Sequence, residues 1–241
     1  MKISVCIPMY NESSICRSAA DTLFRAMEAH RSEYDYEVIF CDDGSDDGSA
    51  ELLRGHIEKC GYSRFRVVGY ENNRGKGAAV RTAVEASVGD CVIYTDCDLA
   101  YGTDVIFEAA KVIGGGEAAA VGSRNLSADG YGSYTFLRRV ASKAYIKVIA
   151  AFAGFRLSDS QCGFKAFDGD CARKIFSLCT TDGFSFDLEV IKIAQKMGID
   201  ICEIPVTVIN HRASKVHLAG DALKMLSDLH RIKKEVKKLD I

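Results

Sequence analysis

Short apolar runs alternate with amphipathic segments along the first half of the chain, and this alternation limits the possible folds more than any other feature. The apolar runs lie at residues 3–7, 37–41, 65–68, 91–95 and 118–121. Segments with helical spacing lie between them, at about 14–30, 46–59, 76–87 and 103–113. Short apolar strands separated by helices are typical of a parallel sheet that is covered on both faces. The sequence therefore predicts an α/β fold with a mostly parallel, Rossmann-like sheet.

The pattern changes after about residue 125. Residues 126–133 are rich in Gly and Ser, residues 134–155 have a helical and increasingly apolar pattern, and residues 162–167 predict a strand. A second strand is predicted over 199–209, where Pro205 favours an edge strand or an irregular stretch. Helices are predicted over 186–197 and 218–239, the latter with a basic face opposite its apolar stripe. We expect one domain over residues 1–241, with 126–241 as a smaller extension.

Composition excludes several classes of protein. The formal net charge of −2 gives no support for nucleic-acid binding. The ten cysteines contain no Cys-x-x-Cys pair, which disfavours a zinc ribbon or a thioredoxin-like motif and suggests a reduced, cytosolic chain. The first apolar run is too short for a signal peptide, and no uncharged apolar stretch approaches 18 residues. Any contact with a membrane is therefore expected to be peripheral.

Two carboxylates, Asp96 and Asp98, follow the apolar run at 91–95. Carboxylates two positions apart beyond a strand can share one hard cation, which can bridge the oxygens of a diphosphate. The pattern alone is weak, because 20 aspartates give about 1.6 such pairs by chance, and Asp168-Gly169-Asp170 is a second one. Only the first pair follows a strand predicted in the α/β half of the chain, and this position distinguishes it from the second pair. We expect Asp96 and Asp98 at a metal site, and the second pair at a turn and a helix cap.

Another acidic pair, Asp42 and Asp43, follows the run at 37–41. An acid at a strand end can accept hydrogen bonds from a base or a ribose hydroxyl, and the glycine that follows permits a sharp turn. The same string is equally compatible with a turn and a helix N-cap. The capping candidates are Ser45, Asp46 and Asp47.

Two further loops contribute candidates at the same end of the predicted sheet. After the first run, Pro8 is followed by Tyr10 and Glu12, which could flank a base, although such a loop alone merely joins a strand to a helix. The string Asn-Arg-Gly-Lys-Gly at 73–77 looks like a phosphate loop at a helix start and contains Lys76. It lacks the Ser or Thr of a P-loop and the last glycine of a dinucleotide fingerprint. Neither an NTPase nor a dehydrogenase is supported.

In this order, these motifs resemble family 2 glycosyltransferases of the GT-A fold. Four motifs in the second half are more specific and resemble those of the dolichyl- and polyprenyl-phosphate sugar synthases. They are Gly-Ser-Arg at 122–124, Asp-Ser-Gln-Cys-Gly-Phe-Lys at 159–165, Gly-Phe-Ser-Phe-Asp-Leu-Glu at 183–189 and Glu-Ile-Pro-Val at 203–206. The string at 161–165 looks closest to the dolichyl-phosphate β-glucosyltransferase branch. The resemblance runs from about residue 2 to 235.

The resemblance implies inverting transfer of a hexose from a nucleotide sugar, of the UDP-glucose or GDP-mannose type, to a polyprenyl or dolichyl phosphate, with Mg²⁺ or Mn²⁺. Residues 1–125 would form the nucleotide-sugar half and 126–241 the acceptor half. The donor would lie at Pro8, Tyr10, Glu12, Asp42, Asp43, Lys76 and Asp96, and the metal at Asp96 and Asp98. The acceptor and other phosphates would lie at Arg124, Arg139, Lys143, Arg212 and Lys215. Residues 99–101 match neither branch, which leaves the donor sugar open.

The chemistry of such a reaction fits these residue types. A phosphate monoester has its second pKa near 6, so it is largely anionic at neutral pH and needs little base catalysis. The enzyme must instead bring two anions together and stabilise a diphosphate leaving group, which a metal and several arginines can do. Asp159 and Asp187 are candidates for a base or for orienting an arginine, and Asp159 is preferred. The expected catalytic set is Asp159, Asp98 and Arg139.

Alternative functions remain open at this point. A GT-A enzyme with a sugar-hydroxyl acceptor would need a firm general base, and a non-catalytic nucleotide- or sugar-binding module would not need the paired carboxylates. A nucleotidyltransferase would need a glycine-rich N-terminal loop that the chain lacks. For a lipid acceptor, we expect a cytoplasmic protein that is peripheral at the inner face of the membrane. The apolar segment 145–155 and the basic C-terminal helix are the candidate contacts, although they also suit a core helix and a solvated face.

Overall fold

The computed structural model describes the backbone of residues 1–130, 154, 157–210 and 218–241. Seven strands in this part of the chain form one sheet in the order β3-β2-β1-β4-β6-β5-β7. The strands are β1 (Lys2–Met9), β2 (Asp35–Asp43), β3 (Phe65–Tyr70), β4 (Cys91–Tyr94), β5 (Ala119–Ser123), β6 (Lys165–Asp168) and β7 (Ile201–Pro205). The helices are α1 (Cys16–Ala29), α2 (Ser49–Cys60), α3 (Lys76–Glu85), α4 (Asp104–Gly114), α6 (Gly169–Leu178), α7 (Phe186–Lys196) and α8 (Leu218–Lys238).

The sheet is parallel except at β6. This strand lies between β4 and β5 and runs antiparallel to both. The pairs β1–β2, β1–β4, β2–β3 and β5–β7 are all parallel. The predicted α/β fold with a mostly parallel sheet is therefore confirmed, and a strand from the second half of the chain lies inside the sheet of the first half.

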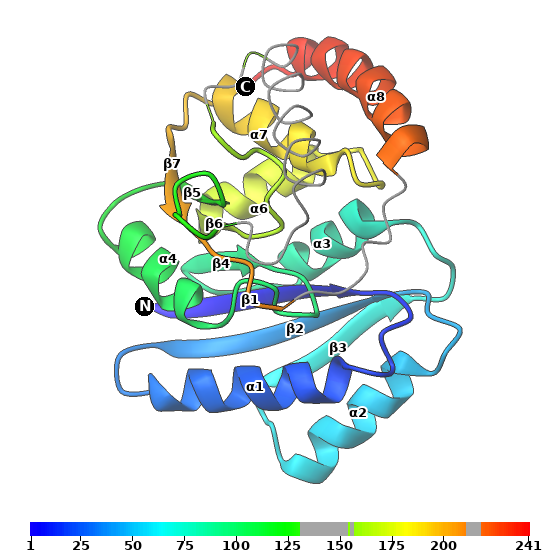
Figure 1. The fold of residues 1–241 in the computed structure, drawn as a ribbon, viewed down its shortest axis with the longest axis vertical. Helices are drawn as coiled ribbons and strands as arrows, with labels where there is room; N and C mark the ends of the chain where they lie inside the picture. The colour runs from blue at the N-terminus through cyan, green and yellow to red at the C-terminus, as the bar shows by residue number, and fades with distance from the viewer. Residues whose placement is uncertain (131–153, 155–156, 211–217) are drawn as a thin grey trace.

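Helices cover both faces of the sheet, and each face has its own hydrophobic core. Side chains along β4 alternate between the two cores. Cys91 and Ile93 face one core, and Val92 and Tyr94 face the other. Side chains of α1, α2 and α4 pack in the first core, and those of α3, α6, α7 and α8 in the second. In Figure 1, α1 and α2 lie below the sheet and α3, α6, α7 and α8 lie above it.

Several boundaries differ from those expected. The strand predicted over 162–167 begins only at Lys165, because residues 162–164 form a loop. The strand predicted over 199–209 ends at Pro205 and lies at the sheet edge, as its proline indicated. Asp168 caps α6 by accepting hydrogen bonds from the amides of Asp170 and Cys171, which confirms the turn-and-cap interpretation of that pair. The helix predicted over 134–155 falls almost entirely outside the described residues. No helix in the described part is long and apolar enough to cross a membrane.

Candidate active site

The carboxyl ends of β1, β2 and β4 meet at one edge of the sheet. These strands are direct neighbours, and Met9 at the end of β1 pairs with Asp42 near the end of β2. Parallel neighbours place the loops that follow them side by side, which is where α/β folds bind ligands. The loops at 10–15, 44–48 and 95–103 therefore lie at the same edge.

The loop after β4 holds the paired carboxylates in a tight turn. Lys76 Nζ lies 2.6 Å from Asp96 Oδ1, and Asp98 Oδ1 accepts a hydrogen bond from the amide of Ala100 at 3.1 Å. Leu99 is buried and has a φ of 48°, a left-handed conformation that is rare for a leucine. Both carboxylates are half-buried. The loop thus presents two acids that are partly removed from water.

The electrostatics of this loop favour a bound cation. Burial raises the pKa of Asp98, and the negative charge of Asp96 raises it further. Burial opposes the charge on Lys76, but Asp96 and Asp187 outweigh this effect and raise the pKa of the ammonium. Carboxylate oxygens are the donors that Mg²⁺ and Mn²⁺ prefer. The donor set therefore fits a hard divalent cation, which would relieve the repulsion between the two acids.

Gly163 brings the segment 159–165 against the carboxylate pair. A Cβ atom on Gly163 would overlap Oδ2 of Asp96 and would lie 3.6 Å from Nζ of Lys76. Only a glycine lets the backbone approach the carboxylate this closely. The string that distinguishes the second half of the sequence therefore forms one wall of the site.

Asp43 has a structural role at the end of β2. It is buried and accepts hydrogen bonds from the Tyr70 hydroxyl at 2.6 Å, Asn73 Nδ2 at 2.9 Å and the Arg74 amide at 2.9 Å. The amide of Gly75 adds a further bond at 2.9 Å. Burial, followed by the bond to Asp43, raises the pKa of Tyr70. The carboxylate of Asp43 therefore fixes the loop that leads to Lys76.

Asp42 and the loop after β1 are joined through one serine. Asp42 accepts hydrogen bonds from both the amide and the hydroxyl of Ser45, at 3.1 Å and 2.6 Å. The Ser45 hydroxyl in turn accepts a hydrogen bond from the amide of Asn11 at 2.9 Å. Asn11 has a φ of 52°, and the neighbouring Tyr10 ring is 39% exposed. The turn interpretation of Asp42 thus has direct support, and Tyr10 presents an aromatic surface at the site edge.

Glu12 and Pro8 occupy different environments. Pro8 is buried within β1 and pairs with Cys41 in β2. Glu12 is half-buried, and its amide donates to the Ser49 hydroxyl at 2.8 Å. The charge of Glu12 contributes, after burial and the charge of Asp96, to the raised pKa of Asp98. Glu12 therefore lies close to the carboxylate pair, whereas Pro8 is a residue of the sheet.

The N-terminus of α3 does not form a phosphate cradle. The amides of Gly77 and Ala78 both donate to the carbonyl oxygen of Asp182, at 2.7 Å and 3.2 Å. A Cβ atom on Gly75 or Gly77 would lie 2.5–2.6 Å from carbonyl oxygens of the segment 181–182. The glycines of the string at 73–77 therefore permit close packing against the segment 181–182, and two amides at the start of the helix are bonded within the protein. The lysine of this string nevertheless reaches the site through its contact with Asp96.

A buried ion pair joins the end of β5 to the segment 159–165. Arg124 Nε lies 2.6 Å from Asp159 Oδ2, Nη2 lies 2.8 Å from Oδ1, and the Arg124 amide lies 3.2 Å from Oδ2. Asp159 is fully buried and Arg124 is 8% exposed. Burial disfavours the charge on Arg124, but the hydrogen bonds that Arg124 donates to Asp159 outweigh this effect and raise the pKa of Arg124. Both oxygens of Asp159 are occupied in a bidentate fork, which suits the orienting role more than that of a base.

A second buried pair lies beneath this segment. Lys165 is fully buried, and its Nζ lies 2.5 Å from Asp187 Oδ1 and 2.8 Å from the carbonyl oxygen of Cys162. The Tyr94 hydroxyl donates to the same carboxylate oxygen at 2.7 Å. The sequence did not single out Lys165, since a lysine inside an apolar strand gives no signal of its partner. Asp187, like Asp159, is therefore the ion-pair partner of a buried basic side chain.

Two buried polar atoms of the segment 159–165 have no hydrogen-bond partner in the described part of the chain. They are the Ser160 hydroxyl and Nε2 of Gln161. Buried polar groups are nearly always paired, so such atoms point to a partner that protein atoms do not supply. Both precede Gly163, which contacts Asp96. Sequence reasoning treated these residues only as part of a string and missed them as ligand candidates.

Comparison with known proteins decides the family. Residues 4–176 match the model of "Glycosyl transferase family 2". The chain belongs to glycosyl transferase family 2. Among its relatives in this family, it is 30% identical to dolichyl-phosphate beta-glucosyltransferase of Dictyostelium discoideum, over 96% of this chain and 73% of that protein. The enzyme of the same name from Drosophila melanogaster is also 30% identical, over 96% and 74%.

Solved structures support the GT-A fold. Glucosyl-3-phosphoglycerate synthase from Mycobacterium tuberculosis, in complex with Mn²⁺, UDP and phosphoglyceric acid, aligns with a TM-score of 0.67 and 19% identity. The alignment covers 100% of this chain and 80% of that structure. At this identity the likeness concerns the fold alone. The family 2 membership and the GT-A fold that the motifs predicted are both confirmed.

Some residues expected at the site of this family 2 enzyme fall outside the described part of the chain. They are Arg139, Lys143, Arg212 and Lys215. Asn210, the last described residue before the second of these stretches, donates through Nδ2 to the carbonyl oxygens of Asp98 and Leu99, at 3.2 Å and 3.3 Å. The amide of Ile209 donates to the carbonyl oxygen of Ala100 at 2.8 Å. The segment after β7 therefore returns to the carboxylate loop.

Proposed function

We propose that this family 2 glycosyltransferase transfers a hexose from a nucleotide sugar to a polyprenyl or dolichyl phosphate, with inversion at the anomeric carbon. The observation that carries the proposal is the packing of the segment 159–165 against the carboxylate pair. This string gave the resemblance to lipid-phosphate enzymes, and it contacts the groups suited to a diphosphate. The dolichyl-phosphate β-glucosyltransferases that are similar over about 95% of the chain favour glucose as the sugar.

The loop after β4 would hold the divalent cation through Asp96 and Asp98. Bound Mg²⁺ or Mn²⁺ would neutralise the diphosphate of the donor and of the leaving group. Lys76 adds a positive charge on the same side, because it already lies 2.6 Å from Asp96. Tyr10, Glu12 and Asp42 would border the nucleoside, at the ends of the adjacent strands. Pro8 and Asp43 would support that surface from within the fold.

Acceptor binding is assigned to the second half of the chain, residues 126–241. Arg124 would face the reacting phosphates in an orientation that Asp159 fixes by its bidentate bond. Arg139, Lys143, Arg212 and Lys215 would neutralise the acceptor phosphate, and the position of Asn210 beside the carboxylate loop supports this assignment for Arg212. Since a phosphate monoester is already anionic, these cations would carry more of the catalysis than a base.

A panel experiment tests the substrate class. The protein is incubated with labelled UDP-glucose, GDP-mannose and UDP-N-acetylglucosamine, each with polyprenyl phosphate or with a soluble sugar that offers only hydroxyl groups. We expect organic-extractable label only with the lipid phosphate, and most strongly with UDP-glucose. Transfer to the hydroxyl sugar, with none to the lipid, would support the alternative acceptor class instead.

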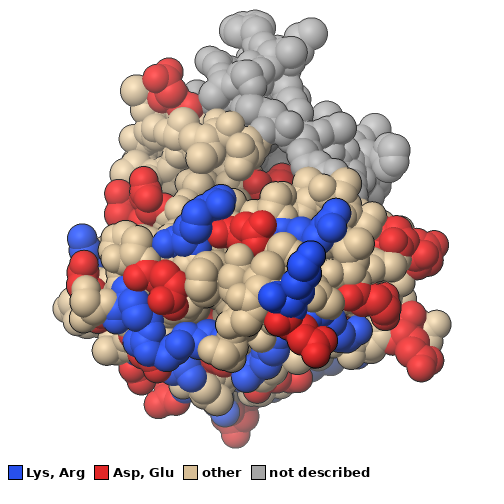
Figure 2. Space-filling view, turned by 90° about the horizontal axis from the view of Figure 1, so that it is seen from below, with Lys and Arg blue, Asp and Glu red and all other residues tan. Residues whose placement is uncertain are grey.

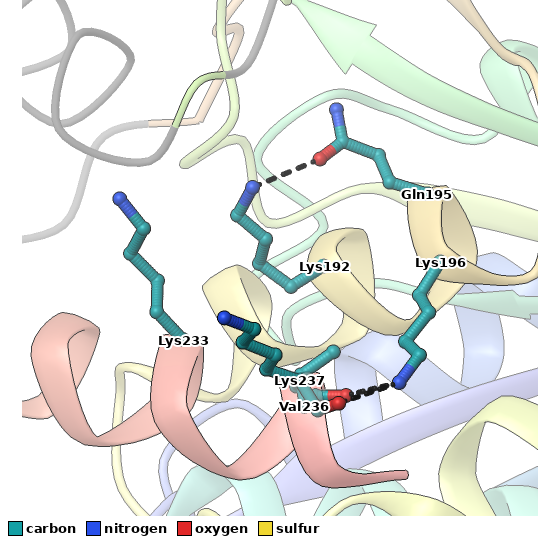
Figure 3. A pocket seen from close by; sticks show the side chains of 6 residues that line it. All are labelled: Lys192, Gln195, Lys196, Lys233, Val236 and Lys237. Carbon is teal, nitrogen blue, oxygen red and sulfur yellow. Dashed lines mark hydrogen bonds between the residues drawn. The ribbon is translucent and has the colours of Figure 1, made fainter. Parts of the chain in front are cut away.

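We further propose that the enzyme works at the cytoplasmic face of a membrane and binds it peripherally through the side that carries α7 and α8. A hollow of about 320 Å³ lies between these helices. Among the described residues, four lysines and no acid line it, as Figure 3 shows. The lining residues are Lys192, Gln195, Lys196, Lys233, Val236 and Lys237. Lys196 is used internally, because its Nζ donates to the carbonyl oxygens of Val236 and Lys237 at 2.9 Å.

The other lysines of the hollow suit anionic headgroups. Burial and the charge of Lys233 lower the pKa of Lys192, so an anion placed between them would relieve their repulsion. Lys192 Nζ lies 4.0 Å from the position that a Cβ atom on Gly154 would take, which places Gly154 beside the hollow. By contrast, acidic and basic residues are mixed over the face that carries α1 and α2 (Figure 2).

Sedimentation with liposomes tests this contact. Binding should rise with the fraction of anionic lipid, fall with added salt, and weaken in the triple variant Lys192→Gln, Lys233→Gln, Lys237→Gln. The triple variant Lys2→Gln, Lys59→Gln, Lys111→Gln removes the same charge elsewhere and should bind as the unmodified protein does. Protein that stays in the supernatant with anionic liposomes at low salt would contradict membrane contact.

A further inference from the structure

Three side chains with different donor atoms meet where α1 and α2 pack together, on the face of the sheet covered by the first core. His56 and Cys60 lie four residues apart on α2 and therefore on one face of that helix. Asp21 lies on α1. One carboxylate oxygen, one imidazole nitrogen and one thiol sulfur lie within 4.8 Å of one another.

The distances between these donors lie on either side of those in a tetrahedral site, and all are within 4.8 Å. Zinc bound at about 2.3 Å to sulfur and about 2.0 Å to nitrogen and oxygen separates its donors by roughly 3.3–3.6 Å. Cys60 Sγ lies 3.8 Å from Nε2 and 3.9 Å from Nδ1 of His56, so the thiol would have to turn towards Nε2 to share an ion with it. His56 Nε2 lies 2.6 Å from Asp21 Oδ1. An ion that replaced the proton shared by the last two atoms would require them to separate by less than about 1 Å.

The carboxylate of this group is held in place by an outer residue. The Tyr62 hydroxyl donates to Asp21 Oδ1 at 2.8 Å, and the Tyr62 ring stacks on Phe24 with ring centroids 4.0 Å apart. Partners of this kind orient a ligand group and are typical of built metal sites. The carboxylate of Asp21 is therefore oriented by a residue that is not itself one of the three donors.

Donor chemistry and exposure indicate which ion would bind. Thiolate and imidazole ligands favour Zn²⁺ and similar thiophilic ions over Mg²⁺ or Mn²⁺. Among the ten cysteines, all of which the structure describes, Cys60 alone is exposed. The fourth position of a tetrahedral ion would therefore face solvent. Binding would release the thiol proton and the proton between the imidazole and the carboxylate to the solution.

We propose that Asp21, His56 and Cys60 form a binding site for a thiophilic divalent cation of the zinc type, separate from the carboxylate pair of the proposed transferase site. The ion would join α1 to α2 and stabilise their packing. This site does not depend on the proposed function, because its ligands lie on other elements and its donors select a different class of metal.

Cobalt titration of the reduced, full-length protein tests the proposal. Co²⁺ should give a sulfur-to-cobalt charge-transfer band and the visible bands of tetrahedral cobalt at one ion per chain, and Zn²⁺ should displace it. Cys60→Ser should abolish the charge-transfer band, and His56→Asn should weaken binding at least tenfold. Tyr62→Phe should weaken it about tenfold through loss of the outer bond to Asp21.

Matched variants separate this site from others. Cys171→Ser removes a half-buried thiol that lies near two other acids and should leave the spectrum unchanged. Asp98→Asn removes the hard-cation site and should also leave it unchanged. Absence of the charge-transfer band, or its persistence in Cys60→Ser, would overturn the proposal. Because Cys60 is exposed, Cys60→Ser should fold normally and keep its transferase activity with Mg²⁺.

Discussion

Replacing Asp98 with asparagine keeps the size of the side chain and removes one of the two charges in the loop after β4. We expect the rate of sugar transfer to fall at least about 100-fold, since misplacing a catalytic cation costs about 3 kcal/mol or more. The metal-free protein should fold normally, because burial and Asp96 already disfavour the ionised carboxylate. Transfer assays and thermal unfolding measure the two effects.

Asp170→Asn is the matched control for this prediction. Asp170 belongs to the second Asp-x-Asp pair, and its side chain is 96% exposed. Its replacement should change neither activity nor stability. Unreduced transfer by Asp98→Asn would remove this carboxylate from the mechanism.

Gly163 offers a second test at the scale of one residue. A methyl group on Gly163 would overlap Asp96 Oδ2, so Gly163→Ala should displace the carboxylate and reduce transfer more than tenfold. Gly55→Ala serves as the control, because a Cβ atom at Gly55 in α2 meets no atom within 4 Å. Alanine is the better helix former, so this variant should be fully active and slightly more stable. Equal activity of the two variants would contradict the close contact between segment 159–165 and the carboxylate pair.

Asp47 gives a prediction about pH. Burial opposes the ionised form of Asp47, but hydrogen bonds from Ser49 and Ser13 outweigh it and lower its pKa to about 2. Because the folded pKa lies below the unfolded value of 3.8, the stabilisation is complete above about pH 4 and is lost as the pH falls towards 2. Urea unfolding of Asp47→Ala should therefore show a deficit in stability at pH 6 that shrinks at pH 3. A deficit independent of pH would assign the effect to packing.

At the scale of elements, the buried pair between Lys165 in β6 and Asp187 in α7 joins the sheet to a helix. Removing one partner leaves an uncompensated buried charge, so Lys165→Met and Asp187→Leu should each cost about 3–5 kcal/mol of unfolding free energy. The double variant should cost less than the sum of the two, because it leaves no unpaired charge. Strictly additive losses in urea unfolding would show that the two groups do not interact.

Local sequence patterns predicted most helices and strands, but few of the contacts that these elements make with one another. The strands and helices of the first half follow from alternating apolar runs, and the position of β7 at the edge follows from Pro205. The late start of β6 could not be predicted, because Cys162 and Phe164 are buried in the core although residues 162–164 form a loop, in which Gly163 contacts Asp96. A pattern of hydrophobic residues does not distinguish a buried loop from a buried strand.

The same limit applies to the site. Asp96 and Asp98 could be predicted as site residues, because they directly follow a strand and the carboxyl ends of parallel strands lie at the ligand-binding edge of the sheet. The partners of Asp43, Asp159 and Asp187 could not, since each bonds to residues that lie 22–93 positions away in the sequence. The edge of the site could therefore be located from the sequence. The sequence does not distinguish carboxylates that face a ligand from those that pair with a lysine or arginine side chain of the protein.

At the scale of the whole molecule, two segments far apart in the sequence form one site because β6 is inserted between β4 and β5. The insertion brings residues 159–165 from the second half of the chain to the carboxylates of the first half. The two halves thus share one sheet. On this account, donor and acceptor meet where the halves join.

Phosphorus NMR of the lipid that the protein makes from UDP-glucose and polyprenyl phosphate, in the presence of Mn²⁺, tests directly whether the lipid phosphate is the acceptor. Family 2 membership alone leaves the acceptor atom open, and this measurement identifies it. We expect the phosphomonoester signal of the lipid to be replaced by that of a phosphodiester, with glucose in the anomeric configuration opposite to that of the donor. No such product should form in the presence of excess EDTA. An unchanged phosphomonoester signal, alongside glucose attached to a hydroxyl group, would show that the enzyme does not use the lipid phosphate as its acceptor.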